Sequence, residues 1–267
     1  MNILEKIVEQ KRIEVGERKS LIPIALLEKS IYFNSPSISL KSYLLREDKS
    51  GIIAEFKRKS PSKGNINQYA KVGVVTLGYM QSGASALSVL TDEQFFGGSD
   101  NDLKQARKLN YCPIVRKDFI IDEYQIIEAR SIGADAILLI ASVLSKEEII
   151  RFSNLAKKLS LEVLLEVHNE KELEKIPNED VLIGVNNRNL ETFEVSLQNS
   201  IDLFSKLPNS VVKVAESGIK TPEDIALLKS VGYNGFLIGE QFMKTPNPSN
   251  ACRTFIEAIQ TQEKVEA

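Results

Sequence analysis

Ionisable side chains end three short apolar runs of this 267-residue chain. Glu55 and Lys57 end the first run, Lys117 follows another, and Glu166 ends a third. An ammonium group can protonate a developing oxyanion and a carboxylate can accept a proton, so this set suits acid–base catalysis on a carbonyl compound. Any one of these residues taken singly would fit a structural ion-pair network equally well. Together, the four favour a catalytic site.

Polar residues and glycines at the ends of three later runs indicate a site for an anion. Asn186 and Arg188 follow one run, and the planar guanidinium of arginine suits a carboxylate or ribose hydroxyls. The next two runs end in Ser217-Gly218 and Gly239-Glu240. Glycine lets backbone N–H groups approach an anion closely, although such glycines are also common turn residues. Their joint placement predicts a phosphorylated substrate.

The only histidine, His168, lies two positions beyond Glu166, and we interpret it as a solvent-exposed or supporting residue rather than as the catalytic base. Cys112 and Cys252 are remote from it and from each other, so no metal-ligand cluster of recognised spacing is present, and we predict no metal. The segment 91–98, TDEQFFGG, brings aromatic rings that can pack beneath a loop or wall an aromatic ligand.

The elements that must position these residues are visible as eight apolar runs rich in Ile, Val and Leu: 52–56, 86–90, 113–115, 136–140, 161–167, 181–185, 211–215 and 235–238. Between them, apolar residues recur at helical spacing, with start signals at Asp122, Ser145 and Thr221 and terminating glycines at Gly133 and Gly232. Eight buried strands, each followed by a helix, predict an α/β fold of the closed (β/α)8 or TIM-barrel type. An open doubly wound sheet is the alternative.

In such a barrel, the carboxyl ends of the strands form one mouth, where catalytic groups lie. Strand side chains alternate, so Glu55 and Lys57 project to the same side, and only the mouth offers them both water and opposite charge. The segment 59–64 follows with Lys, Ser, Pro and Gly and no apolar stripe. We expect it to be a mobile loop that closes over the substrate.

Residues 1–48 precede the first strand and carry helical patterns of their own, at Ile3/Ile7 and at Ile24/Leu27. No Gly/Ser-rich or Pro-rich linker separates them from the rest, so we interpret them as a helical extension packed on a single barrel domain of residues 1–267.

The composition and charge of the chain argue against several classes of binding partner. A formal net charge of −2 provides no overall positive field for nucleic acid or an anionic membrane, and no protein partner is identified. Residues 1–20 lack the apolar core of a signal peptide, and no run reaches the roughly 18 apolar residues of a membrane span. With only two distant cysteines, a reducing cytoplasm is expected.

One segment, residues 53–64 with the sequence IAEFKRKSPSKG, closely resembles the signature of the indole-3-glycerol phosphate synthase family. The resemblance continues in order along the whole predicted barrel, in LTD (90–92), FGG (96–98), RKDFI (116–120), LEVH (165–168), GVNNR (184–188), AESGI (215–219) and LIGE (237–240).

The resemblance implies conversion of 1-(2-carboxyphenylamino)-1-deoxyribulose 5-phosphate to indole-3-glycerol phosphate, with loss of carbon dioxide and water, in tryptophan biosynthesis and without a cofactor. Lys117 then matches the general acid of ring closure, Glu166 the catalytic base, and Lys57 a substrate-anchoring or second acidic lysine. The other matched positions are expected to bind substrate: Glu55, Asn186 and Arg188 to orient it, Ser60 by its carboxylate, Ser217, Gly218, Gly239 and Glu240 at its phosphate, and Phe96, Phe119 and Glu216 beside it.

Two other functions fit the same residues. Lys57 or Lys117 could attack a carbonyl group as the lysine of a Schiff-base aldolase. A barrel that senses a sugar phosphate or holds a partner subunit without catalysis is the second alternative. Paired acids and bases at one rim argue against it, since a sensor has little need of them.

Overall fold

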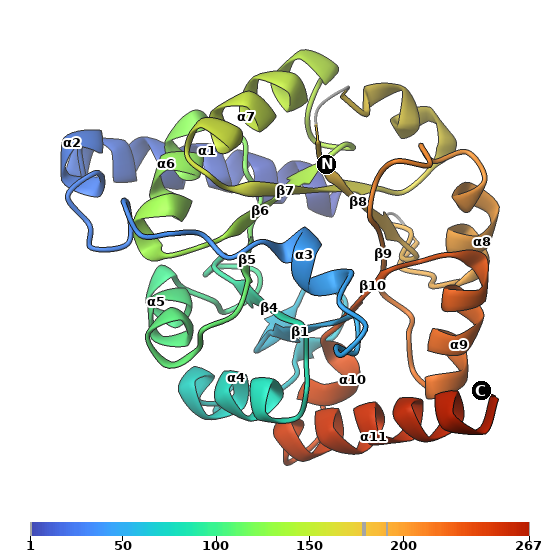
Figure 1. Ribbon diagram of the computed structural model, residues 1–267. Coiled ribbons are helices and arrows are strands. Elements are labelled where there is room, and N and C mark those ends of the chain that lie inside the picture. The colour runs from blue at the N-terminus through green and yellow to red at the C-terminus, as the bar shows by residue number, and fades with distance from the viewer. Residues whose placement is uncertain (1, 178–179, 191, 267) are drawn as a thin grey trace.

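The computed structural model describes residues 2–177, 180–190 and 192–266, and its centre is a closed barrel of eight parallel strands inside a ring of helices (Figure 1). The barrel strands are β1 (Ile52–Phe56), β4 (Ala86–Leu90), β5 (Ile114–Lys117), β6 (Ala136–Ile140), β7 (Glu162–Val167), β8 (Leu182–Asn186), β9 (Lys213–Glu216) and β10 (Gly235–Ile238). β10 pairs in parallel with β1, which closes the ring. The predicted (β/α)8 barrel is confirmed, and the open sheet is wrong. Residues 1 and 267, the ends of the predicted domain, lie outside the described residues.

Helices precede, connect and follow the strands. The extension holds α1 (Ile3–Leu21), α2 (Ile24–Leu27) and α3 (Leu40–Leu44); the connections hold α4 (Val72–Gln81), α5 (Asp100–Leu109), α6 (Glu123–Ile132), α7 (Lys146–Lys158), the 3-10 helix η1 (Glu170–Lys175), α8 (Gln198–Phe204) and α9 (Pro222–Val231); α10 (Glu240–Met243) and α11 (Pro248–Glu266) follow the last strand.

The predicted helix ends are confirmed by the cap geometry. Asp122 accepts a hydrogen bond from the Tyr124 backbone N–H, and Ser145 and Thr221 each form a capping box. Gly133 and Gly232 end α6 and α9 in the left-handed region, where a side chain would be strained.

Three strands extend further toward the mouth than their apolar runs predict. β5 ends at Lys117, β8 at Asn186 and β9 at Glu216. These polar residues belong to the ladder, since Leu90 pairs with Lys117 and Asn186 pairs with Glu216. Their backbones are therefore fixed by the barrel, which suits residues that must hold a defined position.

The interior of the barrel is closed at its amino-terminal end by α3. Leu40 and Leu44 pack with Ala86, Ala136 and Leu182, the first residues of their strands. The larger apolar cluster lies between the strands and the outer helices. Burial of both faces explains why the strands are continuous hydrophobic runs.

At the opposite end, α1 lies over the mouth. Ile3, Leu4 and Ile7 line the same cavity as Lys117, the last residue of β5, while Val15 packs with Leu27 and Tyr124 further along the helix. The N-terminal extension thus reaches both ends of the barrel.

The segment predicted as a loop after β1 forms a short antiparallel hairpin, β2 (Lys59–Ser60) with β3 (Gly64–Asn65). Lys59 N–H also donates to the carbonyl of Phe96, at 3.2 Å. This segment therefore has backbone hydrogen bonds of its own and to the loop after β4.

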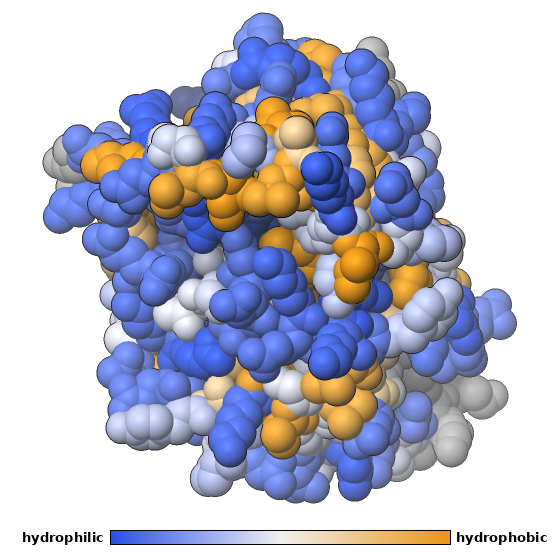
Figure 2. All heavy atoms as spheres, turned by 90° about the vertical axis from the view of Figure 1, so that its left-hand side faces the viewer, coloured by the Kyte–Doolittle hydropathy of each residue, from blue (hydrophilic) through white to orange (hydrophobic). Residues whose placement is uncertain are grey.

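The outer face of the extension is partly apolar. Leu21, Ile24 and Leu26 are exposed, and on the side where α2 lies a band of apolar side chains crosses the surface, with smaller apolar patches below it (Figure 2). Within the described residues, no helix is both long and apolar enough to span a membrane.

Candidate active site

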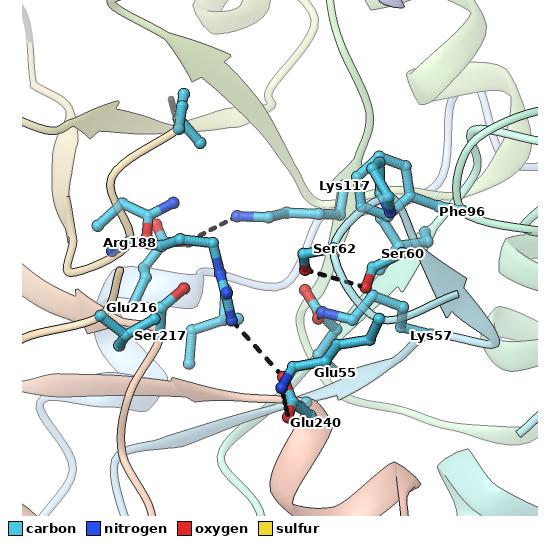
Figure 3. A pocket seen from close by; sticks show the side chains of 18 of the residues that line it. Glu55, Lys57, Ser60, Ser62, Phe96, Lys117, Arg188, Glu216, Ser217 and Glu240 are labelled. Atoms are coloured by element: carbon cyan, nitrogen blue, oxygen red, sulfur yellow. Dashed lines mark hydrogen bonds and ion pairs between the residues drawn. The ribbon is translucent and has the colours of Figure 1, made fainter. Parts of the chain in front are cut away.

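A cavity of about 350 Å³ opens at the carboxyl ends of the strands, and every site residue expected from the sequence lines it. These are Glu55, Lys57, Ser60, Phe96, Lys117, Phe119, Glu166, Asn186, Arg188, Glu216, Ser217, Gly218, Gly239 and Glu240. Among the labelled side chains, Glu55, Lys117, Arg188 and Glu216 come from different parts of the barrel and converge on one space (Figure 3).

Lys117 lies at the centre of the charged groups. Its Nζ lies 3.0 Å from Glu166 Oε2 and 2.5 Å from Glu216 Oε2. Burial alone would lower the pKa of Lys117, but the carboxylates of Glu216 and Glu166 outweigh burial and hold it above its ordinary value. Lys117 is therefore an ammonium group at neutral pH, with protons available for an adjacent oxyanion.

Glu216 differs from Glu166 although both contact the same lysine. Burial, reinforced by the charges of Glu166 and Glu55, raises the pKa of Glu216 to about 7 despite Lys117. Its Oε1 is buried without a hydrogen-bond partner among the described atoms and lies where a Cβ at residue 184 would be, 2.1 Å from the ideal position. Gly184 therefore provides the space for this carboxyl group.

Glu166 is held as a carboxylate. Burial would raise the pKa of Glu166, but Lys117, His168 and a hydrogen bond from Asn186 lower it well below its usual range. His168 Nε2 lies 3.1 Å from Glu166 Oε1, and its Nδ1 lies 3.4 Å from Glu172 Oε2. The predicted supporting role of His168 agrees with this placement, and solvent exposure was wrong because η1 covers the ring with Glu172.

His168 is expected to stay an imidazolium through neutral pH. Burial lowers the pKa of His168, but hydrogen bonds and charges from Glu166 and Glu172 raise it to about 10. Because it is the only histidine, its imidazole Hε1 and Hδ2 resonances can be assigned without ambiguity, and they should not titrate between about pH 5 and about pH 9. The stabilisation from its charge is fully present below the unfolded value of about 6.5 and is lost as the pH rises through about 10. A midpoint near 6.5 would contradict the assignment.

A second pair, Lys57 with Glu55, lies on the β1 side of the cavity, with Nζ 2.5 Å from Oε1. The mouth orientation predicted for both is thus observed. Gly239 contributes to their placement, since a Cβ there would come within 2.4 Å of Glu55 Oε1.

The β9 and β10 ends form the side predicted to bind phosphate. Ser217 and Gly218 both have positive φ, at 66° and 82°, and such a conformation is rare for serine and typical of functional sites. Asn187 fixes the turn by donating to the carbonyl of Ser217 at 3.1 Å. Glu240 faces Arg188 at 3.5 Å (Figure 3).

The opposite wall is aromatic and aliphatic. Phe96 and Phe119 have ring centroids 5.8 Å apart, and Ile3, Leu4 and Ile7 of α1 complete this side. These α1 residues could not be assigned to the site from sequence, because their helical spacing shows a buried face but not the surface that buries it. Among the described residues, no group of three or more His, Cys, Asp or Glu side chains is arranged to hold a metal ion.

A closed barrel with paired lysines and glutamates at its carboxyl-terminal mouth is the arrangement of a (β/α)8-barrel enzyme. Solved structures agree with the fold: 3-hexulose-6-phosphate synthase from Salmonella typhimurium (TM-score 0.62, 12% identity, covering 79% of this chain and 98% of that one) and tryptophan synthase subunit alpha from Legionella pneumophila (TM-score 0.57, 16% identity, 79% and 91%).

The family model for indole-3-glycerol phosphate synthase matches residues 4–255. Relatives of that name include the protein of Bacteroides thetaiotaomicron, 50% identical over 97% of this chain and 99% of its own length, and that of Polynucleobacter asymbioticus, 42% identical over 94% and 97%. The chain belongs to the indole-3-glycerol phosphate synthase family, the carboxy-lyases of tryptophan biosynthesis.

Proposed function

We propose that the family's reaction takes place in the cavity at the barrel mouth, with Lys117 as general acid and Glu166 as general base. The observation that carries this proposal is the contact of Lys117 Nζ with the carboxylates of Glu166 and Glu216, from three strands, inside one cavity. The substrate is 1-(2-carboxyphenylamino)-1-deoxyribulose 5-phosphate.

Ring closure comes first. The ring carbon bearing the carboxylate attacks the ribulose carbonyl carbon, and the electron pair of the C=O bond moves to oxygen. Lys117 stabilises that oxygen and gives it a proton. Attack has interrupted the aromaticity of the benzene ring, and departure of carbon dioxide returns its bonding electrons to that ring and restores it. Glu166 next accepts a proton from the ring as a lysine protonates the departing hydroxyl, so that water leaves and indole forms.

Binding must also fold a flexible substrate so that its two reacting carbons meet. We assign its phosphate to backbone donors near Ser217-Gly218 and Gly239-Glu240, and its carboxylate to Lys57 and Ser60. We assign the ribulose hydroxyls to Asn186, which ends β8 next to β9, and to Arg188, which follows it. The Phe96–Phe119 wall suits the aromatic ring. A single-turnover assay with this substrate, read by indole fluorescence, tests the whole proposal.

A valine at position 218 should weaken substrate binding by roughly tenfold or more, about 1.4 kcal/mol, with a smaller effect on kcat. Gly218 has a left-handed backbone, and a Cβ there would come within 2.6 Å of Val195 Cγ1, so the turn must move. Gly83→Val is the matched control, since Gly83 shares the positive φ and does not line the cavity. Unchanged affinity of the Gly218 variant for a phosphate-bearing analogue would place the phosphate elsewhere.

The Schiff-base alternative is disfavoured by the charge of Lys117. An ammonium group held by two carboxylates has no free electron pair with which to attack a carbonyl. Borohydride should therefore trap no covalent adduct of the substrate with Lys117, and an adduct with Lys57 would favour the aldolase alternative.

We also propose that the extension and the barrel form one domain, which is supported by the packing of α3 and α1 at the two ends of the barrel. The free, buried thiols of Cys112 and Cys252 support a reducing cytoplasm as its location. The partner that this site requires is a small phosphorylated substrate, and nothing in the proposal calls for nucleic acid.

A further inference from the structure

Lys11 occupies an apolar position on the buried face of α1. Ile3, Ile7, Lys11 and Val15 recur every four residues along the helix, and Lys11, at 1% exposure, is more buried than Ile7 or Val15. A buried lysine is costly unless its charge is matched by partners, so its contacts must account for it.

The Nζ atom of Lys11 bridges the ends of two neighbouring strands. It lies 3.0 Å from Asp118 Oδ1, which follows β5, and 3.1 Å from Asp92 Oδ2, which follows β4. Both aspartate side chains are almost fully buried. A third carboxylate, Glu14 on α1 itself, lies 2.8 Å away. One ammonium group therefore ties the helix to two strand ends at the mouth.

Asp92 fixes the loop after β4. Its other oxygen, Oδ1, accepts hydrogen bonds from the backbone N–H groups of Phe95 and Phe96, at 2.7 and 3.1 Å. Phe96 is the ring that faces Phe119 in the cavity wall. The Asp92 carboxylate, which Lys11 holds, thus fixes the backbone position from which the Phe96 ring extends.

Asp118 fixes the end of β5 in the same way. It directly follows Lys117, and it accepts hydrogen bonds from the Phe119 N–H at 2.8 Å and from the Thr91 hydroxyl at 2.6 Å. The Thr91 N–H donates to the carbonyl of Lys117 at 3.1 Å. Asp118 also pairs with a second cation, Arg116, at 3.3 Å. If Lys11 is lost, we therefore expect Asp118 to stay paired but to shift toward Arg116.

We propose that Lys11 is a positioning residue for the reaction, because its ammonium group fixes the end of β5, which carries Lys117, and the loop after β4, which carries Phe96. Helix α1 then contributes to catalysis by positioning site residues, in addition to lining the cavity. This inference rests on the proposed role of Lys117 as general acid.

The test compares Lys11→Met with Lys19→Met. Methionine keeps most of the apolar stem and removes the charge. Lys19 lies on the same helix and pairs with Asp122 at 2.6 Å, but both groups are partly exposed and Lys19 does not line the cavity. We expect Lys11→Met to lower kcat by about 10- to 100-fold, the scale for a misplacement near 1 Å, and to change KM less than about threefold, since the phosphate side is untouched. Lys19→Met should change both by less than about twofold.

Asp92→Asn provides a second route that keeps the Oδ1 acceptor and weakens the pair with Lys11. It should lower kcat in the same sense, and the double variant with Lys11→Met should lose less than the product of the two single losses. If Lys11→Met does not fold, the kcat of Asp92→Asn alone tests the inference. A folded Lys11 or Asp92 variant with wild-type kcat overturns the inference, whatever its melting temperature. Lys117→Ala, measured alongside, separates this outcome from failure of the proposed function, which would appear as turnover without Lys117.

Discussion

Replacing Lys117 with alanine is expected to reduce turnover by roughly 10²- to 10⁴-fold in protein that remains folded. Among the described cavity residues, the variant loses the only cation that forms ion pairs with both Glu166 and Glu216. The oxyanion of ring closure, the first bond-forming step, then loses the ammonium group that we assign to it. Both later products should therefore be absent in a single turnover: neither carbon dioxide from a carboxyl-labelled substrate nor indole fluorescence.

Lys213→Ala is the matched control for that experiment. Lys213 is also a buried lysine on a barrel strand, but it begins β9 and lies at the opposite end of the barrel from the mouth. Its loss should lower the melting temperature and leave turnover of the folded protein near normal. A Lys117 variant that behaved like the Lys213 variant would show a structural ion pair, and the general acid would then be assigned to Lys57.

The barrel was predictable from sequence because strands buried on both faces leave continuous apolar runs, and helix caps leave local signals such as Ser145 with Glu148. The strand ends were less predictable. Lys117, Asn186 and Glu216 belong to the ladder, yet a charged or polar residue interrupts an apolar run whether or not the strand continues. Only pairing with the neighbouring strand distinguishes the two cases.

The site residues were found because they follow consecutive strands, and a parallel barrel brings consecutive strand ends together. The roles of His168 and Lys11 were not visible in that way. His168 depends on Glu172 of η1, and Lys11 depends on aspartates more than 80 positions away in the chain. Lys11 falls in the four-residue series of Ile7 and Val15, but a lysine at such a position ordinarily extends its ammonium group to solvent, so the series does not reveal the aspartates that hold this one.

Glu166→Gln is expected to stop the reaction at a later step than Lys117→Ala. Glutamine keeps the size of the side chain, but its single carbonyl oxygen can replace only one of the two oxygens that face Lys117 and His168, and it cannot take up a proton. Ring closure and decarboxylation need the acid, whereas dehydration needs the base, so carbon dioxide should be released up to one equivalent per site while indole fluorescence does not develop. Steady-state indole formation should fall by roughly 10²- to 10⁴-fold.

Glu172→Gln separates this catalytic loss from a change in charge around His168. Glu172 contacts the same imidazole from the other side, at 3.4 Å, and does not line the cavity. Its replacement should lower stability, most clearly below about pH 6.5 where the imidazolium is fully charged in both folded and unfolded protein, and keep indole formation within about threefold of wild type.

Because the pKa of Glu166 is held well below its usual range, the wild-type base also stays ionised as the pH falls through the ordinary glutamate value of about 4.3. Normal indole formation by the Glu166 variant would remove it as the base and direct attention to Glu216, the other carboxyl group on Lys117, whose pKa of about 7 lets it exchange a proton near neutrality.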